Sequence, residues 1–170
     1  MIEFFLGGAR SGKSRLAEKC AYDSDMELVY IATAERRDRE MAERISHHQR
    51  QRAGAWATVE ESLQLVAALQ RECRHNRCVL VDCLTLWLSN WLEHDPAAWP
   101  QVQSDLLALL PSLEGKIIFV SNEVGQGVVP VNALARNFVD ESGRLHQALA
   151  AVSDRVYFVM AGIQQVIKEN

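Results

Sequence analysis

Eight residues near the N-terminus have the types and spacing of a phosphate-binding loop. The run Gly7-Gly8-Ala9-Arg10-Ser11-Gly12-Lys13-Ser14 matches the pattern Gly-x-x-x-x-Gly-Lys-Ser/Thr. Its first and sixth residues are glycines, which allow backbone angles that turn N–H groups toward a phosphate. We expect Lys13 to reach the outer phosphates of a nucleoside triphosphate and Ser14 to bind Mg²⁺. The alternative is a glycine-rich turn that matches by chance.

A carboxylate that could organise the metal follows a second apolar run. Asp82 ends the segment Cys78–Asp82, which is typical of a buried strand. Ligands of parallel sheets bind at the carboxyl ends of the strands, so we expect Asp82 to lie beside Ser14. It would hold Mg²⁺ directly or through water. The alternative is that Asp82 caps a helix beginning near Thr85.

A pair of histidines is the third candidate for chemistry. A neutral imidazole, from His47 or His48, can attack phosphorus and split one group transfer into two steps. Three arginines near the pair could neutralise the transferring phosphate: Arg44, Arg50 and Arg52. The alternative places His48 at the end of a buried helical stripe with Met41 and Ile45. A metal-binding pair is disfavoured, because adjacent residues on a helix diverge.

The elements that must position these residues alternate along the chain. Short apolar runs predict buried strands at Ile2–Leu6, Leu28–Ala32, Cys78–Asp82, Lys116–Ser121 and Val156–Ala161. Helices are predicted at Lys13–Tyr22, Asp38–Gln51, Glu61–Cys73, Leu84–Glu93, Trp99–Leu110 and Val131–Val152. This alternation indicates crossover connections, and so one α/β domain over residues 1–170 with a mainly parallel sheet flanked by helices.

Composition limits the classes of function. The 170 residues carry 22 acidic and 18 basic side chains, a formal charge of -4, which disfavours binding to nucleic acid. The N-terminus lacks the pattern of a signal peptide, and no apolar run is long enough for a membrane span. We therefore expect a cytoplasmic protein. The four cysteines lack the paired spacing of a zinc site and are expected to be reduced packing residues.

Three blocks of sequence together resemble one enzyme family. The first joins the phosphate loop to Tyr30-Ile31-Ala32-Thr33-Ala34. The second runs from Glu40-Met41 through His47-His48 to Trp56 and Glu60. The third is Asn122-Glu123-Val124-Gly125-Gln126-Gly127-Val128-Val129-Pro130, continuing to Arg136, Phe138, Asp140 and Gly143. In this order they resemble the bifunctional adenosylcobinamide kinase / adenosylcobinamide-phosphate guanylyltransferase of cobalamin synthesis, over nearly the whole chain.

The resemblance implies two successive reactions on a corrinoid substrate. The family phosphorylates the aminopropanol hydroxyl of adenosylcobinamide with ATP or GTP, then transfers GMP from GTP to that phosphate and releases pyrophosphate. A histidine carries the GMP covalently, and by alignment it is His48. The fold implied is a RecA-like P-loop domain assembled as a homotrimer. The implied nucleotide contacts, besides Gly7 to Ser14, are Ala32, Thr33, Ala34, Gln49, Arg50, Gln51, Arg52, Glu60 and Asp82.

Two positions depart from the family pattern, and a third, Glu123, has two possible roles. Val139 stands where the family often has arginine, and His146 where asparagine is common. Glu123 follows a predicted strand, so it either supports ligand binding or caps a backbone N–H at a corner. Two other functions stay open on the residues alone: a P-loop kinase for another small metabolite, and a RecA-like nucleotide-gated binding protein.

Overall fold

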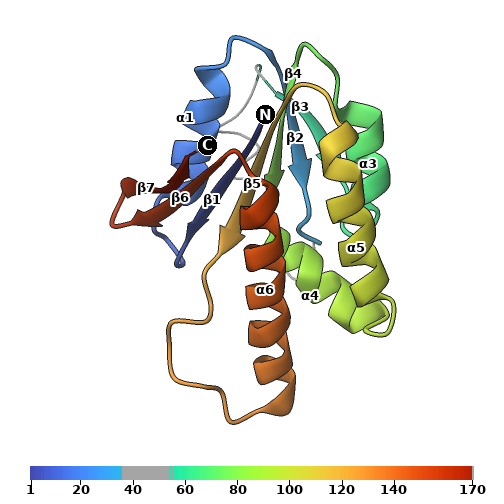
Figure 1. Cartoon of the computed structure of the whole chain (residues 1–170), viewed down its shortest axis with the longest axis vertical. Coiled ribbons are helices and arrows are strands. Elements are labelled where there is room, and N and C mark those ends of the chain that lie inside the picture. The colour runs from blue at the N-terminus through green and yellow to red at the C-terminus, as the bar shows by residue number, and fades with distance from the viewer. Residues whose placement is uncertain (36–53, 55, 170) are drawn as a thin grey trace.

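A seven-stranded sheet forms the centre of the molecule. The structure is a computed structural model that describes residues 1–35, 54 and 56–169. The strands are β1 (Ile2–Gly7), β2 (Glu27–Ala32), β3 (Trp56–Glu60), β4 (Arg77–Asp82), β5 (Lys116–Asn122), β6 (Arg155–Met160) and β7 (Ile163–Glu169). They are arranged β3-β2-β4-β5-β1-β6-β7, and only β7 among them runs antiparallel to its neighbour (Figure 1). The mainly parallel sheet predicted from the sequence is confirmed.

Helices cover both faces of this sheet unequally. They are α1 (Lys13–Tyr22), α3 (Leu65–Glu72), α4 (Leu84–His94), α5 (Trp99–Leu109) and α6 (Ala133–Val152), with a short 3₁₀ turn at Leu110–Ser112. Helix α1 packs on one face, and the other four described helices pack on the opposite face (Figure 1). None of the described helices is long and apolar enough to cross a membrane.

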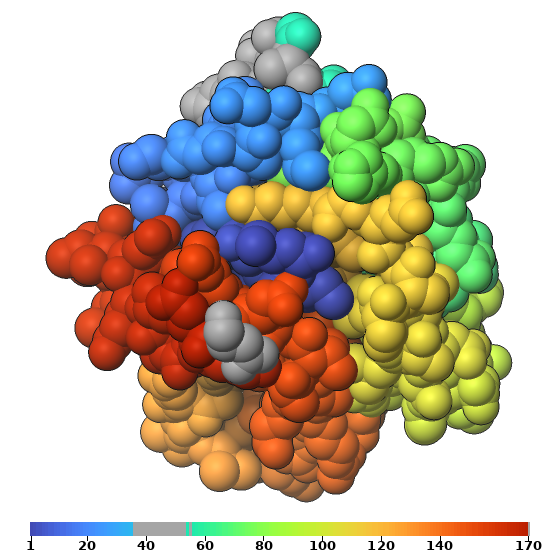
Figure 2. Space-filling view, turned by 45° about the horizontal axis from the view of Figure 1, so that its top comes forward, coloured from blue at the N-terminus to red at the C-terminus, as the bar shows by residue number. Residues whose placement is uncertain are grey.

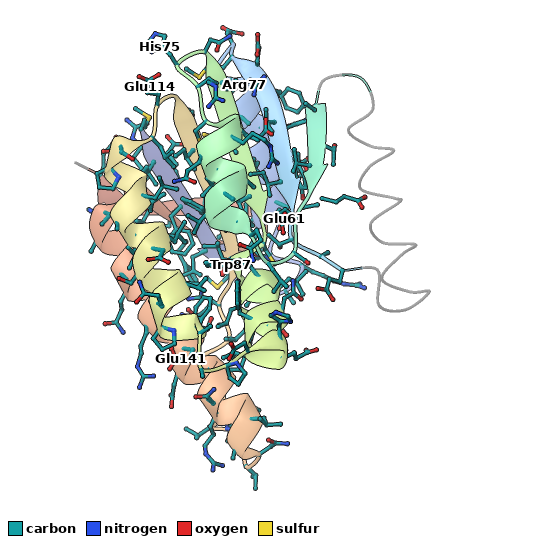
Figure 3. The ribbon with its side chains drawn as sticks, turned by 90° about the vertical axis from the view of Figure 1, so that its right-hand side faces the viewer. Glu61, His75, Arg77, Trp87, Glu114 and Glu141 are labelled. Carbon is teal, nitrogen blue, oxygen red and sulfur yellow. The ribbon has the colours of Figure 1, made fainter. Side chains whose placement is uncertain are left out.

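Two hydrophobic cores result, one on each face of the sheet. Successive side chains of a strand point to opposite faces, so neighbouring residues of β1 serve different cores. Phe4 packs in the larger core with α3 to α6, and Phe5 packs in the smaller core beneath α1. Trp87 of α4 is fully buried in the larger core, and its indole N–H donates to the carbonyl of Leu63 at 2.9 Å (Figure 3). The continuous apolar runs therefore mark strands buried on both sides.

The sheet's two outer strands were not predicted from the sequence. Strand β3 is only five residues long and largely exposed, and β7 is exposed along most of its length. Neither contains the continuous apolar run that marked the central strands. The hairpin of β6 and β7 lies at the surface, where its red segment forms one side of the molecule (Figure 2).

Two helices begin later than predicted, and at each start a side chain accepts backbone N–H groups. The predicted helix Glu61–Cys73 begins at Leu65 instead. Before it, one carboxylate oxygen of Glu61 accepts the N–H groups of Leu63 and Gln64 at 3.0 and 2.8 Å, which stops the helix from starting earlier (Figure 3). Helix α6 begins at Ala133, where Asn132 caps its N–H groups. The predicted helix Asp38–Gln51 lies outside the described residues.

A buried imidazole lies between β5 and α6. His146 is only 7% exposed, and its Nε2 lies 2.8 Å from the hydroxyl of Ser121 and 3.4 Å from that of Ser142. Its Nδ1 lies 4.0 Å from a carboxylate oxygen of Glu123. Burial lowers the pKa of His146 to about 4, although the charge of Glu123 opposes that shift. The imidazole is therefore neutral at physiological pH.

This buried histidine should make the fold sensitive to acid. The unfolded chain protonates its histidine near pH 6.5, but folded His146 resists protonation until about pH 4. The free energy of unfolding should therefore fall as the pH drops through this window, by up to about 3 kcal/mol. His146→Asn should remove that part of the pH dependence. Urea unfolding of both proteins between pH 7 and 4 measures it, and parallel stability curves would contradict the prediction.

Candidate nucleotide-binding site

The predicted site residues at strand ends meet along one edge of the sheet. In the strand register, Ala32 of β2 is the partner of Glu60 on one side and of Asp82 on the other. On the other side of β4 lie β5 and then β1, where Asn122 at the end of β5 is the partner of Gly7 at the end of β1. These residues thus share the carboxyl edge of the sheet, where parallel sheets bind ligands.

Two glycines let the phosphate loop take its shape. A Cβ atom on Gly7 would lie 2.3 Å from the carbonyl oxygen of Val159, because β6 passes close to the end of β1. Gly12 has a φ of 95°, in the left-handed region that favours glycine. Two hydrogen bonds hold the backbone of the phosphate loop. The N–H of Ser11 donates to the Gly8 carbonyl at 3.2 Å, and the N–H of Gly162 donates to the Ser11 carbonyl at 2.8 Å. Close packing thus requires glycine at position 7, and the backbone conformation favours glycine at position 12.

The start of α1 is suited to an anion. No side chain caps the helix, and its first turn contains no acidic residue. Its first N–H groups therefore keep their capacity to bind phosphate oxygens, reinforced by the positive end of the helix dipole. Lys13 is only 7% exposed, and its ammonium group donates to the carbonyl of Gly8 at 3.3 Å. A buried cation folded back over the loop can bind the outer phosphates of a triphosphate.

Asp82 lies at the end of β4 and interacts with a neighbouring strand. One of its carboxylate oxygens accepts the hydroxyl of Tyr30 at 2.9 Å. The alternative role as a helix cap is wrong, because α4 is capped at Cys83 and receives no side-chain hydrogen bond there. Tyr30 orients the Asp82 carboxylate at the edge that also carries the phosphate loop.

The strand-end loop that contains Thr33 is held from two sides. The Thr33 hydroxyl donates to the carbonyl of Cys83 at 2.7 Å and accepts its N–H at 2.9 Å. Asn90 of α4 is buried, and its amide group donates to the carbonyls of Thr33 and Ser62 at 2.9 and 3.0 Å. We predicted no role for Asn90 or Tyr30 from the sequence. A polar residue inside the Leu- and Trp-rich helix α4 was the signal available for Asn90.

A cavity opens beside the first half of the phosphate loop. Its volume is about 350 Å³, and its walls are formed by Gly8, Ala9, Arg10, Ser11, Glu123, Gln126, Phe158, Val159, Met160 and Ala161. Within the described part of the chain, the hydroxyl of Ser11 is a buried side-chain group with no hydrogen-bond partner. Such a group can bind a ligand atom without losing another bond.

The structure thus brings together part of the predicted site. Gly7 to Ser14, Ala32 to Ala34, Glu60 and Asp82 all lie at the carboxyl edge of the sheet, although Glu60 belongs to the outermost strand and is exposed. The histidine candidate His48 and the predicted contacts Gln49, Arg50, Gln51 and Arg52 lie outside the described residues. Glu123 accepts the N–H of Gly125 at 2.5 Å, as expected of a carboxylate at a corner.

The described residues offer oxygen ligands for a metal. Mg²⁺ prefers oxygen, and Ser14 at the start of α1 and Asp82 at the end of β4 supply a hydroxyl and a carboxylate. In the described ranges, no group of three histidine, cysteine or acidic side chains is placed to hold a metal ion. All four cysteines are free thiols and three are buried, as predicted for packing residues.

Solved structures share this fold. An ATPase domain among them superposes with a TM-score of 0.50 at 18% identity, over 92% of this chain and 68% of that chain. The RadB recombinase gives a TM-score of 0.52 at 13% identity, over 92% of this chain and 73% of its own. These likenesses confirm a RecA-like P-loop fold and show the fold alone.

Similarity of sequence extends over nearly the whole chain. The bifunctional adenosylcobalamin biosynthesis protein CobP of Pseudomonas aeruginosa is 50% identical, over 99% of this chain and 98% of its own length. The protein CobU of Escherichia coli, described in the same words, is 39% identical, over 99% of this chain and 100% of its own length. The family model for cobinamide kinase / cobinamide phosphate guanyltransferase matches residues 3–167. The chain therefore belongs to the cobinamide kinase / cobinamide phosphate guanyltransferase family.

Proposed function

We propose that this enzyme phosphorylates the aminopropanol hydroxyl of adenosylcobinamide and then transfers GMP from GTP to the new phosphate. The observation that carries the proposal is the phosphate loop, with its uncapped helix and folded-back lysine, in a chain of this family. One domain over residues 1–170 would contain both activities, since the described part of the chain forms a single sheet.

The kinase step would use the loop and its neighbours. The N–H groups of Gly8 to Ser14 bind the phosphates, and Lys13 stabilises the charge that develops on the transferred group. The substrate hydroxyl attacks the terminal phosphorus, and the nucleoside diphosphate leaves. Ser14 and Asp82 would hold Mg²⁺, which when bound neutralises charge on the phosphate oxygens.

The transfer of GMP would use His48. The support for this is the resemblance to the family and the arginines that flank the histidine pair. The neutral imidazole would attack the α-phosphorus of GTP, pyrophosphate would leave, and the phosphate of the substrate would then take GMP from the histidine. The product is adenosylcobinamide-GDP. A homotrimer, also implied by the resemblance, and a location in the cytoplasm complete the proposal.

Lys13→Ala should lower both activities. The chain contains one phosphate loop, so we expect one triphosphate site to serve both reactions. Without the ammonium group, both rates should fall by about two orders of magnitude or more. Lys19→Ala, in the exposed last turn of the same helix, is the control and should behave as wild type. Normal guanylyl transfer by Lys13→Ala would require a second nucleotide site.

Asp82→Asn should weaken the response to Mg²⁺. The substitution keeps the size of the side chain and an oxygen for the hydroxyl of Tyr30, but it removes the charge that holds the cation. Kinase activity should fall and require far more Mg²⁺, as titration of the rate against Mg²⁺ measures. Asp105→Asn on the exposed side of α5 is the matched control. An unchanged Mg²⁺ dependence would remove Asp82 from the metal site.

His48→Ala should separate the two activities. It should abolish the covalent GMP adduct and the formation of adenosylcobinamide-GDP, while it largely spares phosphorylation of the hydroxyl. Intact mass spectrometry after incubation with GTP and Mg²⁺ detects the adduct, whose P–N bond should be labile in acid and comparatively stable in base. His47→Ala is the control and should retain some adduct.

Other outcomes would assign the histidines differently. A histidine buried in the core predicts a lower melting temperature and a parallel loss of both activities in His48→Ala. An adduct that persists in His48→Ala would exclude this residue as the nucleophile. An adduct mapped to His47 would move the assignment by one residue.

A further inference from the structure

Glu123 lies at the edge of the sheet that carries the phosphate loop. It follows the end of β5, the strand that pairs with β1 on the side toward β4. Glu123 lines the cavity of about 350 Å³, which the phosphate loop from Gly8 to Ser11 and the end of β6 also line. Because Lys13 folds back onto the carbonyl of Gly8, the cavity adjoins the end of the loop that would receive the outer phosphates.

The charges around this cavity suit a reaction between a hydroxyl and a phosphate. Arg10 is the basic side chain of its wall, and Glu123 is the acidic one. The other carboxylates at described strand ends are less well placed: Asp82 belongs to the proposed Mg²⁺ site, and Glu60 lies on β3 at one edge of the sheet. Glu123 is therefore the proton acceptor that the described residues offer next to the loop.

The Glu123 side chain is held rigidly for this role. Its backbone N–H donates to the carbonyl of Gly7 at 3.0 Å, which ties it to the first residue of the loop. One carboxylate oxygen accepts the N–H of Gly125 at 2.5 Å, and the other lies 4.0 Å from Nδ1 of His146. The side chain is 19% exposed, so it can still reach a ligand in the cavity.

His146 lies near the Glu123 carboxylate and adds no second full charge there. Its Nδ1 lies 4.0 Å from a carboxylate oxygen of Glu123, beyond hydrogen-bond distance, and its Nε2 lies 2.8 Å from the hydroxyl of Ser121. Burial lowers the pKa of His146 to about 4, so the imidazole beside Glu123 carries no charge at neutral pH.

We propose that Glu123 is the general base of the kinase step, the residue that takes the proton from the acceptor hydroxyl. The inference rests on the proposed function. As the hydroxyl oxygen forms its bond to the terminal phosphorus, its proton moves to a carboxylate oxygen of Glu123. The bond from that phosphorus to the bridging oxygen breaks, and the nucleoside diphosphate leaves with the electron pair. Glu123 then releases its proton to solvent.

This role predicts that only one of the two activities depends on Glu123. The acceptor of the kinase step is an alcohol, which must lose a proton to become a phosphate ester. The acceptor of the second step is already a phosphate anion, which attacks without needing a base. Glu123→Gln should therefore produce a separation of activities opposite to that of His48→Ala.

The test is Glu123→Gln assayed separately for each reaction. The amide keeps an oxygen for the N–H of Gly125 but cannot accept the proton. Phosphorylation of adenosylcobinamide should fall by about 10²- to 10⁴-fold in kcat. The affinity for nucleotide, the GMP adduct, the transfer of GMP to adenosylcobinamide-phosphate and the melting temperature should stay at wild-type values.

Glu114→Gln is the matched control. It makes the same chemical change in an exposed residue before β5, at the opposite end of the strand from Glu123 (Figure 3). It should leave both rates unchanged. Glu123→Asp, which keeps the charge but shortens its reach, should give a kinase rate between those of wild type and Glu123→Gln.

Three results would overturn the assignment. They are a kinase rate for Glu123→Gln within about threefold of wild type, an equal loss of both activities, and a loss of nucleotide affinity that accounts for the slower rate. If Glu123→Gln does not fold, Glu123→Asp decides by the same comparison of the two rates. Failure of the proposed function can be told apart from failure of the Glu123 assignment, because the wild-type protein would then not phosphorylate adenosylcobinamide at all.

Discussion

The site depends on the close contact of three backbone segments at Gly7. This residue lies between the end of β5 and the end of β6, and a side chain there would collide with the carbonyl of Val159. Its own carbonyl accepts the N–H of Glu123. The absence of one methyl group thus lets the phosphate loop, the corner after β5 and the hairpin of β6 and β7 pack against one another.

Around this contact, the proposed phosphate-binding groups differ from the proposed reacting groups. The proposed phosphate site is mainly backbone: N–H groups of a loop and of an uncapped helix, positioned by glycines and by hydrogen bonds from neighbouring segments. The proposed metal ligand Asp82 and the proposed base Glu123 lie at the ends of other strands, where each accepts a hydrogen bond. Asp82 accepts from the hydroxyl of Tyr30, and Glu123 accepts from the N–H of Gly125. Such fixed orientation reduces the reorganisation needed during a reaction.

Patterns within short segments predicted much of this arrangement. The apolar runs gave the five central strands, and the loop motif gave α1 with its bounds unchanged. The same patterns missed β3 and β7, because an edge strand is stabilised by backbone pairing and needs no continuous apolar run. They also missed the start of α3, where Glu61 competes for the first N–H groups.

Contacts between distant segments could not be predicted in the same way. Asn90 supports the loop after β2 from a helix 57 residues later in the chain, and no local pattern shows that pairing. Glu123 was identified as lying on the edge that binds ligands, but its relation to the phosphate loop depends on strand order. Only the placement of β5 beside β1 brings the corner against Gly7.

The position of β1 has a consequence for how the protein is made. Its two neighbours in the sheet are β5 and β6, which begin at Lys116 and Arg155. Synthesis runs from the N-terminus toward the C-terminus, so β1 is made before both of its neighbours. Strand β1, which leads into the phosphate loop, therefore stays unpaired until β5 and β6 are made, and Phe4 and Phe5 stay exposed during this time. The phosphate loop can take its folded shape only after β5 and β6 have been made, so nucleotide binding must follow the synthesis of both strands.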